Sequence, residues 1–294
     1  MDLEKILPKS GPPIEEVSKY IEKYKNDLIV IKYGGNVFID RDIFNNFISD
    51  ISILNKLGLS IVVVHGGGPR IKRELEKSNI QSKFIRGLRV TDEKIISIVE
   101  KVLIDFNDDI VNSLNKRGTK AISINTKKNN IIEVVPESKE LGFVGKPDRI
   151  NIDVINKIIE EKIVPIISPL GIGVNNQTYN INGDTAAGAI AKSLKSRRLL
   201  LMTNIEGVLD KEKNLIEEIT SSEILQMIKD EIITEGMIPK INTCLDAINN
   251  EVTAVGIIDG RKKHSILFEI FSDKGSGTLI RQWKNLKKLS TGYL

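Results

Sequence analysis

The stretch SIVVVHGGGPRI, residues 60–71, places four consecutive apolar residues directly before a histidine and three glycines. A short β-branched run of this kind predicts a strand that is buried on both faces, as in a parallel sheet. Pro69 follows the glycines where a helix can begin, because the N–H that proline lacks has no helical partner at that position. The stretch therefore predicts a strand, a glycine turn and a helix in succession.

The same alternation extends in both directions along the chain. The runs LIVIKY at 28–33 and RRLLLMT at 197–203 predict two more buried strands. Helical spacing follows at about 41–57, from near Asp92 and from near Asp184. Strands that alternate with helices are typical of a parallel sheet with crossover helices, so we expect an α/β fold.

No internal repeat or flexible linker divides the 294 residues. We expect an N-terminal helical segment at 1–26 and two lobes, 27–195 and 196–294, that share one continuous sheet. In the N-terminal segment, Ile14, Val17, Ile21 and Tyr24 form an apolar stripe on a short helix. This stripe fits packing on the helix's own domain and, nearly as well, docking to a partner.

Composition argues against several classes of function. The net charge of +4 is too balanced for a nucleic-acid arm, and 5% aromatic residues are too few for a base-stacking platform. No apolar run approaches the ~20 residues of a membrane span. We therefore expect no nucleic-acid or membrane partner and a soluble compartment. The single cysteine, Cys244, lies among apolar residues, which favours a buried structural role.

Two predicted strands end in glycines: Gly34 and Gly35 follow the first, and Gly66, Gly67 and Gly68 follow the second. In open parallel sheets, ligands bind beyond the carboxyl ends of the strands, where a glycine-rich turn directs N–H groups at an anion. One glycine pair alone would fit a tight turn. Two such loops at equivalent strand ends favour a phosphate site.

Familiar nucleotide and hydrolase motifs fail in this chain. The P-loop pattern fails at Gly145-Lys146, because Glu140 stands in place of the first glycine and Pro147 follows the lysine. HGGGPRI does not fit G-x-G-x-x-G, since Ile71 takes the last place. An HGGG loop also serves lipases as an oxyanion hole, but no serine here lies in a G-x-S-x-G setting, which excludes that hydrolase class.

Two lysines lie where a bound anion would need them. Lys32 stands two residues before Gly34 and directs its ammonium toward the glycine turn. Lys240 lies in the first turn of a predicted helix, where a cation opposes the helix dipole by about 0.3–1 kcal/mol unless an anion compensates. A solvated surface lysine is the alternative for each.

Six stretches form a set in their order and spacing: K-x-G-G at 32–35, HGGGP at 65–69, GLRVTDE at 87–93, GFVGK at 142–146, YNINGDTAAG at 179–188 and GMIPK at 236–240. From about Tyr20 to Thr278 the chain resembles the amino-acid kinase family, and within it the members that act on N-acetyl-L-glutamate. GLRVT and YNINGDTAA carry that finer resemblance. It implies a three-layer αβα sandwich with an open, mostly parallel central sheet.

The resemblance implies that MgATP phosphorylates N-acetyl-L-glutamate to N-acetyl-L-glutamyl 5-phosphate, the second step of arginine biosynthesis. The γ-carboxylate, with a reference pKa of roughly 4.3, is already ionised and needs no general base. We therefore expect His65 to orient the glycine loop and His264 to be a surface or packing residue. Mg²⁺ would be held mainly by the ATP phosphates and water, with no side-chain metal site.

The resemblance also implies roles for individual residues. Lys32 and Lys240 would neutralise the transferring phosphoryl group, and Asp184 would hold both lysines. The main-chain N–H groups of Gly35, Gly66 and Gly67 would donate to the phosphoryl oxygens.

In the same way, Arg89 would bind the substrate α-carboxylate, and Asn180 together with Gly66 and Gly67 would complete the acetylglutamate contacts. The ATP-binding residues implied are Lys32, Gly34, Gly35, Thr203, Asn204, Gly207 and Lys240. Asn204 stands where the family usually has an aspartate after the threonine. This departure predicts altered nucleotide contacts without loss of activity.

Regulation and assembly follow from the resemblance as well. In arginine-sensitive members the N-terminal helix interlaces with its copy, so we expect a homodimer or a homohexamer and feedback inhibition by arginine. Glu269 would pair with the effector's guanidinium, and the turn from Gly275 to Gly277 would receive its carboxylate. In photosynthetic organisms the PII signalling protein is a partner of such enzymes. PII is therefore a possible partner here, in a bacterial cytoplasm or a plastid stroma.

Two alternatives stay open. The chain could be another kinase of this family, acting on aspartate, glutamate, carbamate or UMP, although GLRVT paired with YNINGD disfavours this. It could also be a non-catalytic arginine-sensing module. The joint presence of Lys32, Asp184 and Lys240 disfavours the second alternative.

Overall fold

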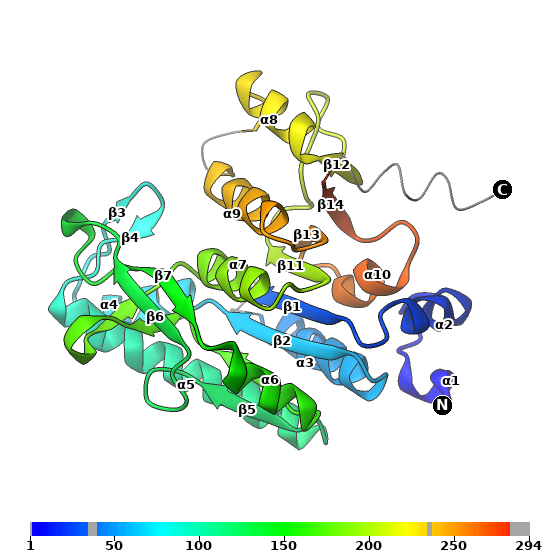
Figure 1. The fold of residues 1–294 in the computed structure, drawn as a ribbon, viewed down its shortest axis with the longest axis horizontal. Helices are drawn as coiled ribbons and strands as arrows, with labels where there is room; N and C mark the ends of the chain where they lie inside the picture. The colour runs from blue at the N-terminus through cyan, green and yellow to red at the C-terminus, as the bar shows by residue number, and fades with distance from the viewer. Residues whose placement is uncertain (1, 35–39, 234–236, 283–294) are drawn as a thin grey trace.

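The computed structural model describes residues 2–34, 40–233 and 237–282 and centres on an eight-stranded sheet (Figure 1). The strand order is β12-β14-β13-β11-β1-β2-β8-β5. The bounds are β1 Leu28–Tyr33, β2 Ser60–His65, β5 Ala121–Ile124, β8 Val164–Ile167, β11 Arg198–Thr203, β12 Glu218–Thr220, β13 Ala254–Asp259 and β14 Gly277–Arg281.

The six strands from β13 to β5 pair in parallel. Only β14 runs antiparallel to its neighbour β13, and β12 pairs in parallel with β14. The expectation of a mostly parallel sheet is confirmed. β1 lies between β2 and β11, so their carboxyl ends meet at one edge of the sheet.

Helices cover both faces of this sheet. Alternate strand residues point to opposite faces, so Ile29 and Ile31 of β1 join one core and Val30 joins the other. The helices that pack in the first core are α2 Ile14–Lys23, α3 Arg41–Lys56, α5 Glu93–Lys116 and α10 Ser265–Phe271, with α1 Leu3–Ile6 at its edge. Those in the second are α6 Ile152–Glu160, α7 Gly183–Ser193, α8 Ser221–Lys229 and α9 Ile238–Asn249. The three layers predicted by the resemblance are confirmed.

A second, four-stranded sheet of order β10-β9-β6-β7 lies on one side of the molecule, beside the β3-β4 hairpin (Figure 1). The remaining helix, α4 Gly68–Lys77, packs on α5 in a small third core. The bounds of the other strands are β3 Phe84–Ile85, β4 Leu88–Arg89, β6 Ile132–Pro136, β7 Gly145–Ile150, β9 Leu170–Ile172 and β10 Thr178–Asn180, with 3₁₀ turns at Lys139–Leu141 and Val174–Asn176.

The N-terminal helix α2 packs against α10 of its own chain. Val17 is fully buried, and the Tyr20 hydroxyl donates to Asp273 at 2.7 Å. In this single chain the apolar stripe is thus covered by its own domain, as the first of the two interpretations expected. In the part of the chain that the structure describes, no helix is long and apolar enough to cross a membrane.

Candidate active site

The ends of β1 and β2 bring two of the predicted motifs together. Lys32 pairs with Val64 across the two strands, and Tyr33 pairs with His65. The Gly66 N–H then donates to the Tyr33 carbonyl oxygen at 2.8 Å, which ties the second glycine turn to the end of β1. Gly34 and the second glycine turn therefore lie at the same carboxyl edge of the sheet.

Asp184 lies between two lysines at this edge. Lys32 Nζ is 2.8 Å from Asp184 Oδ1, and Lys240 Nζ is 2.5 Å from Asp184 Oδ2. The three side chains come from β1, α7 and α9, and each is at most 16% exposed. One carboxylate shared by two ammonium groups leaves an excess positive charge in a mostly buried place.

The shared carboxylate stays ionised. Burial alone would raise the pKa of Asp184, but the charges of Lys32 and Lys240 outweigh burial and hold that pKa well below its usual range. Burial lowers the pKa of Lys32, the Asp184 charge raises it in part, and the nearby Lys240 lowers it again. A second anion at this place would favour the charged form of Lys32.

Local sequence at the start of α7 puts Asp184 in position. The Asn182 side chain caps the helix and accepts from the N–H groups of Asp184 at 2.9 Å and Thr185 at 3.1 Å. An aspartate in the first helical turn is also favoured by the helix dipole. The absence of a side chain at Gly183 leaves room for the Lys32 side chain, since a Cβ at this position would lie 3.3 Å from Lys32 Cε. Asn182 and Gly183 thus shape the turn rather than the chemistry.

The bare glycines make room for the protein's own side chains. A Cβ on Gly34 would overlap the Lys32 ammonium, and a Cβ on Gly67 would lie 2.5 Å from Leu103 of α5. Gly68, by contrast, has open space where its Cβ would be. Two of the predicted phosphate-loop glycines are therefore required by packing within the chain.

The N–H of Gly66 has an acceptor within the protein. We expected Gly35, Gly66 and Gly67 to donate, but the Gly66 N–H is already bonded to Tyr33. Gly35 lies outside the described residues. The Gly67 N–H, by contrast, has no acceptor among the residues that the structure describes.

A cavity of about 780 Å³ opens above the lysine and carboxylate group. Lys32 and Asp184 line one end, together with Gly66 and Gly67, and the predicted substrate residues Arg89 and Asn180 line the cavity as well. The structure thus brings the expected substrate residues Arg89 and Asn180 to the same cavity as Lys32 and Asp184.

The Arg89 guanidinium is held without a carboxylate. It donates to the Ser82 hydroxyl and to the Gly68 carbonyl oxygen at 3.5 Å, and it lies 4.8 Å from the centre of the Phe84 ring. Within residues 2–34, 40–233 and 237–282, no carboxylate lies within 4 Å of it. A 9% exposed guanidinium with neutral partners is suited to receive a carboxylate from a ligand.

Three of the motifs form one wall of the cavity. Phe143 of GFVGK donates its N–H to the Thr91 carbonyl oxygen of GLRVT at 2.7 Å. Asn180 of YNINGD donates its N–H to the Phe143 carbonyl oxygen at 2.9 Å. Through these main-chain hydrogen bonds, three motifs that lie far apart in the sequence line one cavity.

The comparisons with known proteins agree with this geometry. A model of the amino acid kinase family matches residues 27–259. Over 281 residues the chain is 56% identical to the acetylglutamate kinase of Pelagibacter ubique, covering 96% of this chain and 98% of that protein. The chain belongs to the amino acid kinase family, among its acetylglutamate kinases.

Two further matches support the same placement. The chain is 43% identical over 277 residues to the acetylglutamate kinase of Methylobacterium nodulans, covering 90% of this chain and 91% of that protein. An N-acetylglutamate synthase structure from Neisseria gonorrhoeae superposes with a TM-score of 0.83 at 21% identity, over 91% of this chain. The match spans 62% of that synthase, and at this identity it shows a shared fold only.

Apart from Lys32, the described residues expected to bind nucleotide do not line the large cavity of this amino acid kinase. Thr203 ends β11 beside β1, and its hydroxyl lies 3.5 Å from Asn204 Oδ1. Gly207 has a packing role, because its Cβ would overlap the Thr278 hydroxyl. Neither Thr203, Asn204 nor Gly207 lines the cavity, and Lys240 is linked to it through Asp184.

The residues expected to bind arginine lie around a second, smaller cavity of about 110 Å³. Glu269 lines it and is 4% exposed. The turn that follows Glu269 is already engaged, since the Ser276 N–H donates to Glu269 Oε2 at 2.9 Å and the Gly277 N–H also bonds this carboxylate. The expectation that the turn from Gly275 to Gly277 receives the effector's carboxylate stays a prediction.

A cation deeper in the second cavity was missed from the sequence. Arg198 of β11 is 7% exposed, and its Nη1 is buried without a hydrogen-bond partner in the described structure. Its Nε donates to the Tyr24 hydroxyl at 2.9 Å. Arg198 sits in the run RRLLLMT, where it was taken only as part of a buried strand. A charged residue at a buried strand position is the feature that could have indicated it.

Both histidines of the chain are buried. His65 lies against the Gly66 carbonyl oxygen at 2.9 Å, in line with the expected role in orienting the loop. His264 is 4% exposed and lies 2.6 Å from Asp50, so it is a packing residue and not a surface one. Asn107 of α5, 3.1 Å from His65, was missed. It falls on the apolar face between Leu103 and Ile110, where a buried polar residue calls for an explanation.

Proposed function

We propose that this chain transfers the γ-phosphoryl group of ATP to the γ-carboxylate of N-acetyl-L-glutamate, giving N-acetyl-L-glutamyl 5-phosphate and ADP in arginine biosynthesis. The observation that carries the proposal is Asp184 between Lys32 and Lys240, beside a cavity lined by Arg89. Membership of the acetylglutamate kinases supports the choice of substrate.

The charges of the site fit this reaction. A carboxylate that attacks a phosphoryl group meets electrostatic repulsion, and phosphoryl-transfer enzymes act chiefly by charge stabilisation and positioning. Lys32 and Lys240 supply two positive charges against the single negative charge of Asp184. The excess positive charge would stabilise the transferring group, and no general base is required because the nucleophile is ionised.

The cavity fits a dicarboxylate with an apolar cap. Arg89 would bind the α-carboxylate and Asn180 the amide of the acetyl group. Leu103 and Val144 line the same cavity and would contact the acetyl methyl group. The γ-carboxylate would then face Lys32 and the Gly67 N–H. This orientation of the substrate follows from the position of the Arg89 guanidinium in the cavity.

ATP would lie on the β11 side of the lysines. Thr203 and Asn204 follow β11, whose carboxyl end adjoins that of β1, and would contact the nucleotide, with Asn204 altering the purine contacts. Gly34 and Gly207 would contribute through the shape of their turns. Among the described residues, no three His, Cys, Asp or Glu side chains form a metal site. Mg²⁺ would be carried mainly by the ATP phosphates and water, as the resemblance implies.

Arginine would regulate the enzyme from the second cavity. Glu269 would pair with the effector's guanidinium, and the unpaired Nη1 of Arg198 would receive its carboxylate. Tyr20 of α2 lines this cavity, so an effector there would touch the N-terminal helix. That contact would couple effector binding to assembly, for which we propose a homodimer or a homohexamer.

The organisms of the relatives support one of the two compartments. The acetylglutamate kinases named above come from bacteria, so we propose the bacterial cytoplasm in preference to a plastid stroma. PII binding stays a proposal that a pull-down with purified PII would test.

A coupled ADP-release assay tests the function. ADP should appear with ATP, Mg²⁺ and N-acetyl-L-glutamate, and at most at background level with aspartate, glutamate, carbamate or UMP. Turnover with one of those four instead would assign the chain to another kinase of the family. Arginine binding by calorimetry without any turnover would identify a sensing module.

A further inference from the structure

The imidazole of His65 lies between the glycine turn and a buried asparagine. His65 ends β2 and is fully buried. Its Nδ1 is 2.9 Å from the Gly66 carbonyl oxygen, and its Nε2 is 3.1 Å from Nδ2 of Asn107 in α5. Each ring nitrogen has one protein partner, so the position of the ring proton decides which nitrogen donates.

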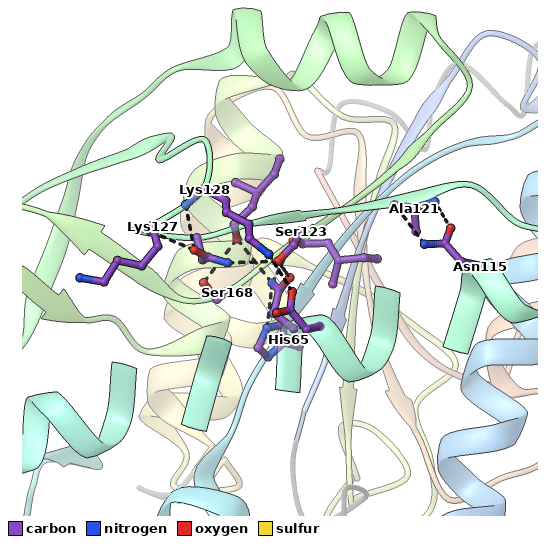
Figure 2. Close-up of polar contacts among 12 residues, drawn as sticks. His65, Asn115, Ala121, Ser123, Lys127, Lys128 and Ser168 are labelled. Atoms are coloured by element: carbon purple, nitrogen blue, oxygen red, sulfur yellow. Dashed lines mark hydrogen bonds and ion pairs between the residues drawn. The ribbon is translucent and has the colours of Figure 1, made fainter. Parts of the chain in front are cut away.

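The Asn107 carboxamide has one orientation that satisfies its neighbours. Its Nδ2 lies 2.9 Å from the Ile166 carbonyl oxygen and 3.4 Å from that of Ile124, at the ends of β8 and β5. Its Oδ1 accepts from the Ser123 hydroxyl, which Figure 2 shows gathered with His65. A flipped amide would set Oδ1 against two carbonyl oxygens, so Nδ2 faces His65.

We propose that Asn107 is a positioning residue of the phosphoryl-transfer site and acts by holding His65 as the Nδ1–H tautomer. The Asn107 Nδ2 group can only donate, so Nε2 of His65 must accept. The ring proton then lies on Nδ1, which donates to the Gly66 carbonyl oxygen. Burial lowers the pKa of His65 to about 4, which keeps the ring neutral at neutral pH.

This hydrogen bond fixes the peptide between Gly66 and Gly67. In a trans peptide the carbonyl and the N–H point in opposite directions. Holding the Gly66 carbonyl against His65 therefore points the Gly67 N–H away from the ring. Gly67 lines the large cavity together with Lys32. Asn107 thus sets the direction of a main-chain donor without touching the substrate itself.

The first test uses the unaltered protein with ¹⁵N-labelled imidazoles. The chain has two histidines, and a His264→Asn variant identifies the second set of signals. At neutral pH we expect His65 with a protonated Nδ1 and an unprotonated Nε2 in the NMR spectrum. A spectrum of the Nε2–H tautomer or of the imidazolium would overturn the proposal. This test needs no substitution at His65, Asn107 or Ser123.

The second test is Asn107→Leu, which removes both polar atoms at similar volume. We expect a mixture of His65 tautomers and a roughly tenfold fall in kcat, with the KM for acetylglutamate within about twofold, because a misdirected donor weakens transition-state contacts. Should Asn107→Leu not fold, Ser123→Ala, which frees the Asn107 Oδ1, should shift both readouts in the same direction. Unchanged tautomer and kcat would contradict the proposal.

Asn115→Leu is the matched control on the same helix. Asn115 Oδ1 accepts from the Ala121 N–H of β5 at 3.0 Å, and Figure 2 shows this pair apart from His65. The control should leave the tautomer and kcat unchanged; an equal loss would mean that Asn107 acts only through stability. The kinetic readout rests on the proposed function, whereas the NMR readout does not. Absence of acetylglutamate-dependent turnover in the unaltered protein would therefore count against the function alone.

Discussion

Lys32 and Lys240 contact the two oxygens of the same carboxylate, that of Asp184, at 2.8 and 2.5 Å. Lys32 is the last residue but one of a central strand, and Lys240 lies in the first turn of a helix near the far end of the chain. Because both are mostly buried and share one negative charge, the site carries a net positive charge before any ligand binds. Substitution of Asp184 or of either lysine should therefore affect phosphoryl transfer.

Asp184→Asn should reduce kcat by roughly 100-fold, because an amide no longer holds both ammonium groups in place. The isosteric change keeps the side-chain volume, so the protein should stay folded by circular dichroism. Asp246→Asn is the matched control, since Asp246 pairs with Lys192 at 2.8 Å on the surface. Surface pairs contribute little, and kcat of the control should stay within about twofold. Equal losses in both variants would argue against a role for the shared carboxylate.

Gly67→Ala should destabilise the protein by about 1–3 kcal/mol, because the new methyl group would lie 2.5 Å from Leu103 in a packed core. Gly68→Ala has open space for its methyl group and should change the free energy of unfolding by less than about 0.5 kcal/mol. Urea denaturation of both variants measures the difference. If Gly67→Ala were as stable as Gly68→Ala, the packing explanation of this glycine would be wrong.

His65 should make stability depend on pH. Its pKa is about 4 in the folded protein against 6.5 for the free side chain, chiefly because of burial. The unfolded chain therefore binds the proton more readily, and stability is complete above pH 6.5 and falls as the pH drops toward 4. The loss is roughly 3 kcal/mol over that window.

His65→Gln removes this titration and isolates its contribution from those of the carboxylates. The difference in unfolding free energy between the unaltered protein and His65→Gln should change by this amount between neutral pH and about pH 4. A difference that does not vary with pH would mean that His65 is not held neutral.

Glu269→Gln should abolish inhibition by millimolar arginine, because a neutral amide cannot pair with the effector's guanidinium. The glutamine oxygen can still accept from the Ser276 N–H, so the turn should keep its shape. The readout is the ratio of rates with and without arginine, measured on each protein. Inhibition of the variant equal to that of the unaltered protein would place the effector elsewhere.

Much of the fold could be predicted because the apolar runs are unambiguous. LIVIKY and SIVVVH coincide with β1 and β2, since continuous β-branched runs are stable only as buried strands. Asp92 was expected near the start of a helix and caps α5 through its side chain. Lys32 and Gly66 lie close together as expected, because the parallel strands β1 and β2 end at one edge of the sheet.

The contacts that decided individual roles could not be predicted from local sequence. A side chain at Gly67 would clash with Leu103, and the Gly66 N–H donates to the Tyr33 carbonyl oxygen. Both partners are distant in the sequence, so no local pattern predicts these contacts. Asn107 contacts His65 and the carbonyl oxygens of Ile124 and Ile166, which lie near the ends of three strands that are distant from it in the sequence. Arg198 was hidden for the same reason, as a charge within a buried strand.

The central claim is that two lysines around Asp184 stabilise the transferring phosphoryl group. The most direct measurement is single-turnover phosphoryl transfer by Lys32→Met and Lys240→Met, with Lys192→Met, a surface-paired lysine, as the control. We predict that each of the first two slows the chemical step by about 100-fold or more with little change in acetylglutamate affinity, and that the control does not. Full-speed transfer by Lys240→Met would contradict the account.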